Sequence, residues 1–211
     1  MIKIIKNFLP EQEAVKLSKE IYDTPASWWS YATKVKNLDP VYVNDNLRGQ
    51  QIMSSTNREL VDSLRAGQFT YRFKRSTNHV TNCPCYECKF REEYLQNKLK
   101  IRIQEEMNWQ DSTLFESFVS AYGVGDFLSM HTDKDRGVAF ILNLTDRWKP
   151  EYGGMLNVLQ EDGTYKAIPP EFNSLVLMSI NDDGGTPHFV SEVSQYAPHS
   201  RVAISGWYNE R

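Results

Sequence analysis

The sequence predicts a mainly β fold in which helices pack outside a two-sheet sandwich or barrel. From Leu114 onward the chain is a series of short segments rich in β-branched and aromatic residues, separated by glycine, proline and aspartate turns. The N-terminal half instead has two stretches whose apolar residues recur at helical spacing. With no internal repeat or evident linker, the 211 residues predict a single domain, in which residues 1–113 support a core formed by residues 114–211.

In the N-terminal half, residues 2–8 predict a strand, and Pro10 to Tyr22 predict an amphipathic helix with the proline at its start. Residues 25–48 predict loops with short strands. Residues 68–74 alternate aromatic and polar side chains, and this period of two indicates a strand. A second helix is predicted where apolar residues recur every four positions, at Leu95, Leu99, Ile103 and Met107.

The C-terminal half predicts five strands, over residues 115–122, 138–144, 155–159, 174–180 and 201–208. The last strand has two unlike faces, because alternate residues point to opposite sides. One face is a core face interrupted by a glycine: Val202, Ile204, Gly206 and Tyr208. The other carries Arg201, Ala203, Ser205 and Trp207, and predicts a pocket wall in which Arg201 clamps a carboxylate with two parallel hydrogen bonds. The alternative is a surface arginine on a final edge strand.

Composition and charge argue against a membrane span and against global attraction to nucleic acid. The net charge is −3, which gives no general attraction to a polyanion. No segment approaches the ~18 consecutive apolar residues of a spanning helix. The first residues have charges spaced through them and no small-residue cleavage site, unlike a secretory signal. Three cysteines without such a signal indicate a reducing, cytoplasmic setting.

The stretch from Arg65 to Arg91 departs from this overall charge. It contains several basic residues against the single acid Glu87, interleaved with aromatic residues. A solvated hairpin is the common explanation of such a run. The alternative is a surface that faces an anionic or extended partner, with single-stranded nucleic acid as one candidate.

His131-Thr132-Asp133 places two metal-ligand side chains two residues apart. In an extended segment these side chains point to the same side, so an imidazole and a carboxylate can converge on one ion. His188, which follows the predicted strand 174–180 and a glycine-rich turn, is the candidate third ligand. Two histidines and one carboxylate on one face of a metal are typical of non-haem Fe(II) oxygenases. The alternative is a chance His-x-Asp beside a structural histidine.

Five motifs in order resemble the prolyl-4-hydroxylase-like group of Fe(II)- and 2-oxoglutarate-dependent dioxygenases. The resemblance covers about residues 114–211. The motifs are Tyr122-Gly-Val-Gly-Asp-Phe-Leu-Ser-Met-His131-Thr-Asp133, Arg136 before a strand that ends in Trp148, Gly153-Gly154-Met155-Leu156, Pro187-His188, and Arg201-Val-Ala-Ile-Ser-Gly-Trp207-Tyr208.

The resemblance implies a double-stranded β-helix (jelly-roll) core buttressed by N-terminal helices. It implies that His131, Asp133 and His188 bind Fe(II), and that Arg201 pairs with the far carboxylate of the cosubstrate 2-oxoglutarate. It also implies that Tyr122 lines the cosubstrate pocket and that Trp207 stands near the iron. Asn143 stands where relatives often place a tyrosine on the cosubstrate carboxylate.

The implied reaction uses O₂, converts 2-oxoglutarate to succinate and CO₂, and hydroxylates proline in a peptide or protein, with ascorbate as a further candidate cofactor. The alternatives are a hydroxylase of another substrate, a free amino acid or nucleic acid, or a catalytically silent jelly-roll binding module. The chain departs from the family pattern in two further places: His188 and Arg201 are separated by an extended loop over residues 191–200, and Ala203 replaces a common serine.

A cluster of zinc-type ligands lies upstream of the core, at His79, Cys83, Cys85 and Cys88. Cys85-x-x-Cys88 has the spacing of structural zinc sites, and His79 would complete a Cys₃His set. The alternatives are three reduced thiols or a redox-labile pair. By resemblance, the segment from Phe69 to Phe90 lies where related enzymes close over their substrates, and it is predicted to cover the mouth of the site.

Overall fold

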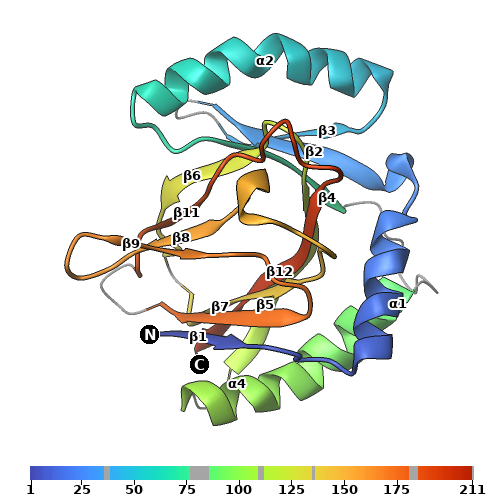
Figure 1. Cartoon of the computed structure of the whole chain (residues 1–211), viewed down its shortest axis with the longest axis vertical. Coiled ribbons are helices and arrows are strands. Elements are labelled where there is room, and N and C mark those ends of the chain that lie inside the picture. The colour runs from blue at the N-terminus through green and yellow to red at the C-terminus, as the bar shows by residue number, and fades with distance from the viewer. Residues whose placement is uncertain (36–38, 77–85, 109–111, 135, 181–184, 211) are drawn as a thin grey trace.

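The computed structural model describes residues 1–35, 39–76, 86–108, 112–134, 136–180 and 185–210 (Figure 1). Its strands form one antiparallel sheet in the order β1-β10-β7-β12-β5-β4-β6-β11-β8-β9, and β2 joins β4 to β3. The sheet curls into a half-barrel, so that β6, β11, β8 and β9 lie opposite β5, β12, β7 and β10. The predicted mainly β fold with flanking helices is confirmed.

The strands have the following bounds: β1 Ile2–Ile5, β2 Trp29–Lys34, β3 Val41–Asn44, β4 Tyr71–Ser76, β5 Ser112–Tyr122, β6 Phe127–His131, β7 Val138–Asn143, β8 Leu156–Leu159, β9 Tyr165–Ile168, β10 Ser174–Ser179, β11 His188–Val190 and β12 Arg201–Glu210. The helices are α1 Glu11–Tyr22, α2 Leu47–Arg65, α3 Tyr86–Phe90 and α4 Leu99–Met107. A π-helical segment, η2 Arg91–Lys98, connects α3 to α4, and η1 Ala26–Trp28 and η3 Pro150–Tyr152 are single 3₁₀ turns.

The two predicted helices cover the outer face of the half-barrel. Helix α1 follows Pro10 and buries Ala14, Leu17, Ser18 and Ile21 along one face. The predicted helix over 95–107 is the second half of the run from α3 to α4, and the four apolar residues that predicted it are buried. These side chains pack on alternate residues of β7, β10 and β12, and the same core contains Phe140 and Tyr208. Figure 1 shows α1 and α4 on this side.

The other face of the same strands points into the half-barrel. Ala139, Val176 and Met178 belong to a second apolar cluster together with Phe73 and Tyr122. The predicted division of β12 into a core face and a pocket face is therefore confirmed. A glycine is needed at residue 206, because a Cβ there would lie 2.3 Å from the backbone oxygen of Glu116.

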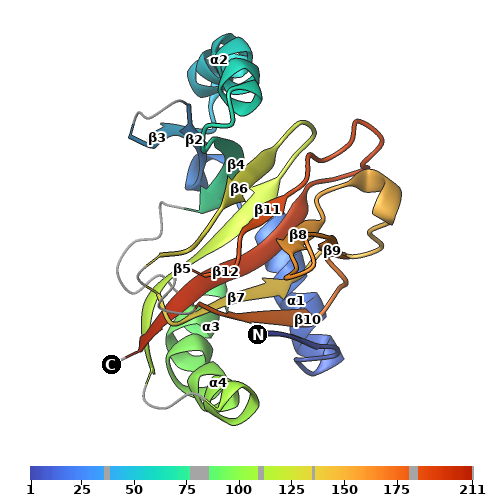
Figure 2. The same cartoon turned by 90° about the vertical axis from the view of Figure 1, so that its left-hand side faces the viewer.

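Helix α2 was not predicted, and it is the main difference from the expected layout. Asn46 caps it by accepting a hydrogen bond from the backbone N–H of Gly49, at 2.9 Å. The helix lies across the β2–β3 hairpin, and Figure 2 shows it at the opposite end of the molecule from α3 and α4. No helix among the described residues is long and apolar enough to cross a membrane.

Candidate active site

The half-barrel encloses a cavity of about 360 Å³. Its walls come from the inward faces of β4, β5, β7 and β12 on one side and from β6, β8 and β11 on the other. Aromatic side chains dominate the lining, and the charged side chains gather in a few places. Pockets of this kind, largely apolar with a few convergent polar groups, are the usual sites for small ligands.

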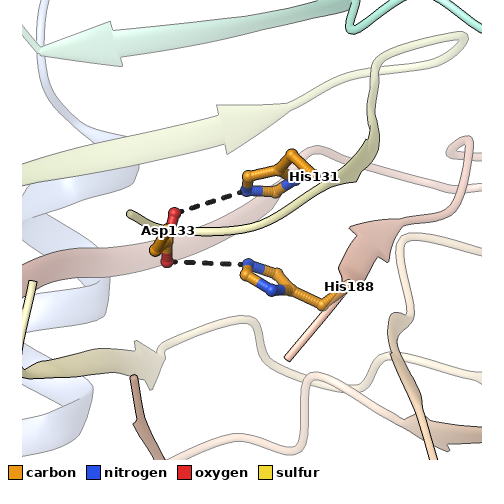
Figure 3. Close-up of side chains that lie close together, drawn as sticks. All are labelled: His131, Asp133 and His188. Atoms are coloured by element: carbon orange, nitrogen blue, oxygen red, sulfur yellow. Dashed lines mark ion pairs between the residues drawn. The ribbon is translucent and has the colours of Figure 1, made fainter. Parts of the chain in front are cut away.

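His131, Asp133 and His188 converge at this cavity (Figure 3). His131 ends β6, His188 begins β11, and the two residues are direct partners in the antiparallel pairing of these strands. His131 Nε2 lies 3.6 Å from Asp133 Oδ1, and His188 Nε2 lies 3.7 Å from Asp133 Oδ2. One ligand atom from each residue falls within 4.8 Å of the others, so a single ion can contact all three.

Backbone carbonyls orient both imidazole rings. Nδ1 of His131 lies 2.9 Å from the oxygen of Ser129, and Nδ1 of His188 lies 2.9 Å from the oxygen of Thr186. Because a carbonyl oxygen only accepts, each Nδ1 carries the proton, and each Nε2 presents its lone pair to the centre. Burial, together with the neighbouring His188, lowers the pKa of His131 to about 4, which keeps this ring neutral and able to bind a metal.

Two aromatic side chains fix the triad from outside. The indole Nε1 of Trp207 donates a hydrogen bond to Asp133 Oδ2 at 2.8 Å. The ring of Phe69 stacks on His131, with ring centroids 5.1 Å apart and an interplanar angle of 26°. Partners of this kind set the direction of metal ligands. The sequence placed Trp207 near the metal, but the contact from Phe69 was not foreseen.

Arg201 lies at the far end of the cavity wall as a buried cation without an acidic partner. The residue is 3% exposed. Its Nη2 donates to Asn143 Oδ1 at 3.4 Å, whereas Nε has no hydrogen-bond partner, and no carboxylate of the described residues forms an ion pair with it. The guanidinium lies 5.1 Å from the centre of the Tyr122 ring. Burial lowers the pKa of Arg201, as expected for a cation removed from water.

The Gly153-Gly154 turn makes room for this arginine. Both glycines have positive φ, and a Cβ on Gly154 would lie 3.1 Å from Arg201 Cδ. The loop over residues 191–200 packs on the same turn, since Gly153 bridges Val193 in antiparallel fashion. Val193 also exchanges backbone hydrogen bonds with Gly125 and Asp126. The extended loop between the second histidine and Arg201 is thus held by two turns.

Tyr122 and Asn143 occupy different positions relative to the cavity. Tyr122 lines it, stacks on Phe73 with ring centroids 4.9 Å apart, and has its pKa raised by burial, so its phenol stays protonated. Asn143 lies behind Arg201 instead: its Oδ1 accepts from the guanidinium, and its Nδ2 donates to Ser174 Oγ at 3.2 Å. Asn143 is not among the residues that line the cavity. Its shorter side chain explains this position, because an asparagine does not reach where a tyrosine would.

Asp126 is a buried residue that the sequence did not single out. Its Oδ2 accepts from the backbone N–H of Gly123 at 2.9 Å, and its Oδ1 accepts from Arg72 Nε at 2.7 Å. Burial raises the pKa of Asp126 although Arg72 opposes this shift. The carboxylate ties together the turn that joins β5, which carries Tyr122, to β6, which carries His131. Its position in Gly123-x-Gly125-Asp126 was the available signal.

The segment from Phe69 to Phe90 divides into two parts. Phe69 and strand β4 line the cavity, so this part lies at the site as predicted, but as a paired strand. Phe90 belongs instead to the outer core with α1 and α4. Of the predicted zinc cluster, His79, Cys83 and Cys85 lie outside the described residues, and Cys88 is buried.

The basic residues of β4 each have an acidic partner. Arg72 pairs with Asp126 and Lys74 with Asp45, both at 2.7 Å. Arg75 pairs with Glu116 at 2.8 Å. The basic and aromatic character of this stretch therefore reflects internal ion pairs around the cavity and gives no support to a nucleic-acid surface.

The fold and the converging triad define a class, and comparison with known proteins agrees with it. Residues 117–209 match the model of the 2OG-Fe(II) oxygenase superfamily. The superfamily implies Fe(II) and 2-oxoglutarate as cofactor and cosubstrate.

Among individual relatives, the chain is 35% identical over 95 residues to mouse (Mus musculus) prolyl 3-hydroxylase OGFOD1. The match covers 41% of this chain and 17% of the mouse protein. The solved structure of a Pseudomonas putida prolyl-4-hydroxylase superposes with a TM-score of 0.62 at 17% identity, over 100% of this chain and 92% of that one.

A Trichoplax adhaerens prolyl hydroxylase, solved with a peptide fragment of the hypoxia inducible factor oxygen degradation domain, also gives a TM-score of 0.62. Its identity to this chain is 19%, and the superposition covers 99% of this chain and 83% of that one. These likenesses confirm the predicted jelly-roll core buttressed by helices.

Proposed function

We propose that the protein is an Fe(II)- and 2-oxoglutarate-dependent dioxygenase that hydroxylates proline in a peptide or protein. One observation carries the proposal: a buried arginine, which has no counter-ion among the described residues, shares a cavity with three converging metal ligands. A buried cation is costly unless it is paired, so the arrangement is complete only with an anionic ligand. A dicarboxylate that also reaches the metal meets both requirements.

The residues of the cavity fit both Fe(II) and 2-oxoglutarate. Nε2 of His131, Nε2 of His188 and one oxygen of Asp133 would hold Fe(II) and leave its other positions open. Arg201 would bind the far carboxylate of 2-oxoglutarate through the N–H groups of its guanidinium. Two imidazoles and one carboxylate form a donor set that suits Fe(II), whereas structural zinc sites are typically rich in thiolates.

When bound, Fe(II) and 2-oxoglutarate supply the O₂-dependent conversion of 2-oxoglutarate to succinate and CO₂ together with hydroxylation of a C–H bond. The protein's part is to bind and orient. Trp207 fixes Asp133 by its indole hydrogen bond, so the carboxylate would face a bound metal in one direction. Tyr122 and Phe73 cover the cosubstrate end with stacked rings and exclude water from Arg201, which strengthens the charge pair.

The choice of a peptide or protein substrate rests on likeness. The mouse relative and the two solved structures are prolyl hydroxylases, and one of them was solved with a peptide. A free amino acid or nucleic acid remains the alternative substrate, and a silent binding module the alternative class. The ion-paired cations of β4 offer no support for nucleic acid.

The test supplies purified protein with Fe(II), 2-oxoglutarate, ascorbate and a library of proline-containing peptides. We expect succinate to form and some peptides to gain the mass of one oxygen atom. His131→Ala should abolish both signals, whereas Arg102→Gln on the outer helix α4 should leave both unchanged. If 2-oxoglutarate is neither bound nor consumed by the wild type, the proposal is wrong. Oxidation confined to free amino acids or nucleic acid would refute the substrate class alone.

A further inference from the structure

Besides Arg201, the cavity lining contains Arg75 and Arg136, and Arg75 is an arginine that the proposed chemistry does not use. It lies on β4 on the same face as Phe69, Tyr71 and Phe73, and all four residues line the cavity. Its ion-pair partner Glu116 faces Trp207 in the pairing of β5 with β12, whereas Tyr122 faces Arg201. The Arg75 guanidinium lies beside the ring of Phe118, and that of Arg201 lies beside the ring of Tyr122. These rings are four residues apart on β5, roughly 13 Å at the rise of a strand, so the two guanidinium groups lie toward opposite ends of the cavity wall.

The guanidinium of Arg75 is held firmly by three neighbours. Its central carbon lies 4.3 Å from the centre of the Phe118 ring and 5.7 Å from that of Tyr42. Its Nη2 donates to Glu116 Oε1 at 2.8 Å. The side chain of Arg75 is 19% exposed, and that of Glu116 is 40% exposed. Stacking and the ion pair together fix the plane of the guanidinium at the more open end of the cavity.

One donor of this fixed group is buried without an acceptor. Nε has no hydrogen-bond partner, and within the described part of the chain the guanidinium donates through Nη2 to Glu116. The charge of Arg75 is already balanced by Glu116, but its Nε–H is not satisfied. An incoming acceptor would therefore gain a hydrogen bond without having to neutralise a charge.

The ion pair between Arg75 and Glu116 determines which kind of hydrogen-bond acceptor can bind to Arg75. A second carboxylate beside Arg75 would also stand beside the carboxylate of Glu116, and like charges at close range repel. A neutral carbonyl oxygen suffers no such repulsion. The main chain of a peptide offers neutral carbonyls on both sides of any residue, whereas a free amino acid presents a carboxylate in that place. Arg201, which has no acidic partner in the described part of the chain, is expected to have the opposite preference in the same cavity.

We infer that Arg75 is a specificity-determining residue that donates to a main-chain carbonyl of a peptide substrate, with Glu116 setting both its position and its charge. The inference rests on the proposed function and deepens it, because it explains how the site accepts peptides and refuses free amino acids. It also assigns Glu116 a second role: its carboxylate excludes acidic residues from the substrate positions next to the contact.

The test uses the full chain loaded with Mn(II) and 2-oxoglutarate without O₂, so that binding is measured without turnover. The probe is an immobilised library of acetylated, amidated peptides with a central proline and random flanking residues. We expect the wild type to retain a subset of peptides that free L-proline does not displace. Arg75→Gln should lower retention at least tenfold, while Arg102→Gln should leave it unchanged. Arg75→Lys, which keeps the charge but loses the planar fork, should show an intermediate loss.

Glu116→Gln gives the sharpest result, because it predicts a change of preference. With its counter-ion removed, Arg75 should favour anionic acceptors, so the retained pool should become enriched in Asp and Glu next to proline. Calorimetric binding of 2-oxoglutarate in the same samples reports whether each variant is folded and whether the proposed function holds. If the wild type does not bind 2-oxoglutarate, the proposed function is refuted. Normal 2-oxoglutarate binding without retained peptides, or unchanged retention in Arg75→Gln, or an unchanged pool in Glu116→Gln, overturns the inference alone.

Discussion

The two ends of the cavity present the same side chain in two electrostatic states. At one end Arg201 is 3% exposed and has no acidic partner among the described residues. At the other end Arg75 is ion-paired with Glu116. The triad of His131, Asp133 and His188 lies in the same cavity. The presence or absence of one carboxylate therefore distinguishes an end that requires an anion from an end that accepts a neutral group.

The largest effect is expected from Arg201→Gln. Removing the guanidinium leaves the far carboxylate of 2-oxoglutarate buried without a partner, which costs about 3–5 kcal/mol. The dissociation constant of 2-oxoglutarate should rise by roughly 10²- to 4 × 10³-fold, while that of Mn(II) changes little. Calorimetry without O₂ measures both constants, and Arg75→Gln serves as the matched variant at the other end. A rise below about fivefold, or an equal rise in both arginine variants, would contradict the comparison.

Asn143→Asp should make the Arg201 end of the cavity resemble the Arg75 end, where the arginine is ion-paired. The new carboxylate would sit where Asn143 Oδ1 now accepts from Arg201, and it would give the arginine a counter-ion. Because the bound carboxylate would then face a like charge, we expect 2-oxoglutarate to bind roughly 10- to 100-fold more weakly. Asn143→Ser, which removes the amide without adding charge, is the control and should have a smaller effect. Equal affinities in the two variants would show that charge balance at Arg201 does not matter.

A smaller effect is expected from Trp207→Phe at the triad. The substitution keeps an aromatic ring but removes the hydrogen bond from Nε1 to Asp133. Partners of metal ligands are typically worth about 10- to 100-fold in metal affinity, and we expect the lower end for this half-buried contact. Competition against a fluorescent chelator measures Mn(II) binding. Unchanged Mn(II) affinity would mean that the indole does not position the carboxylate.

Much of the site could be predicted because it depends on local geometry. The convergence of His131 and Asp133 was predicted from an extended segment, although β6 ends at His131 and Asp133 lies just beyond it. The two faces of β12 follow from its period of two. In contrast, Arg75 and Glu116 are 41 residues apart, and only the pairing of β4 with β5 brings them together. The direct pairing of β11 with β6, which aligns His188 with His131, had no local signal either.

Helix α2 and the position of Asn143 behind Arg201 were not predicted. The residues of α2 include a glycine and many polar side chains, so periodicity alone is weak, and the helix is stabilised by packing on the β2–β3 hairpin. Gly49 is needed there because a Cβ would lie 2.0 Å from the backbone oxygen of Asn44. Asn143 was aligned with a tyrosine of relatives, but its reach depends on side-chain length, and it contacts Arg201 instead of lining the cavity.

The smallest effect concerns the turn beside Arg201. Gly154 and Gly163 both have positive φ, but a Cβ added to Gly154 would lie 3.1 Å from Arg201 Cδ, whereas one added to Gly163 would have no neighbour within 4 Å. Alanine at either residue should cost about 1–2 kcal/mol of folding free energy from backbone strain. Gly154→Ala should in addition weaken 2-oxoglutarate binding about two- to fivefold, whereas Gly163→Ala should not. Thermal melting and calorimetry on the pair measure the two effects, and identical binding in both variants would remove the turn from the site.

The most direct measurement is a crystal structure of the protein grown without O₂ in the presence of Mn(II) and 2-oxoglutarate. We predict one anomalous peak at roughly 2.0–2.3 Å from His131 Nε2, His188 Nε2 and an oxygen of Asp133. The far carboxylate of 2-oxoglutarate should accept hydrogen bonds from Arg201 at about 2.7–2.9 Å, and Arg75 should remain paired with Glu116. A metal bound away from the triad, or the far carboxylate bound to Arg75 with Arg201 still unpaired, would contradict the assignment of the two ends.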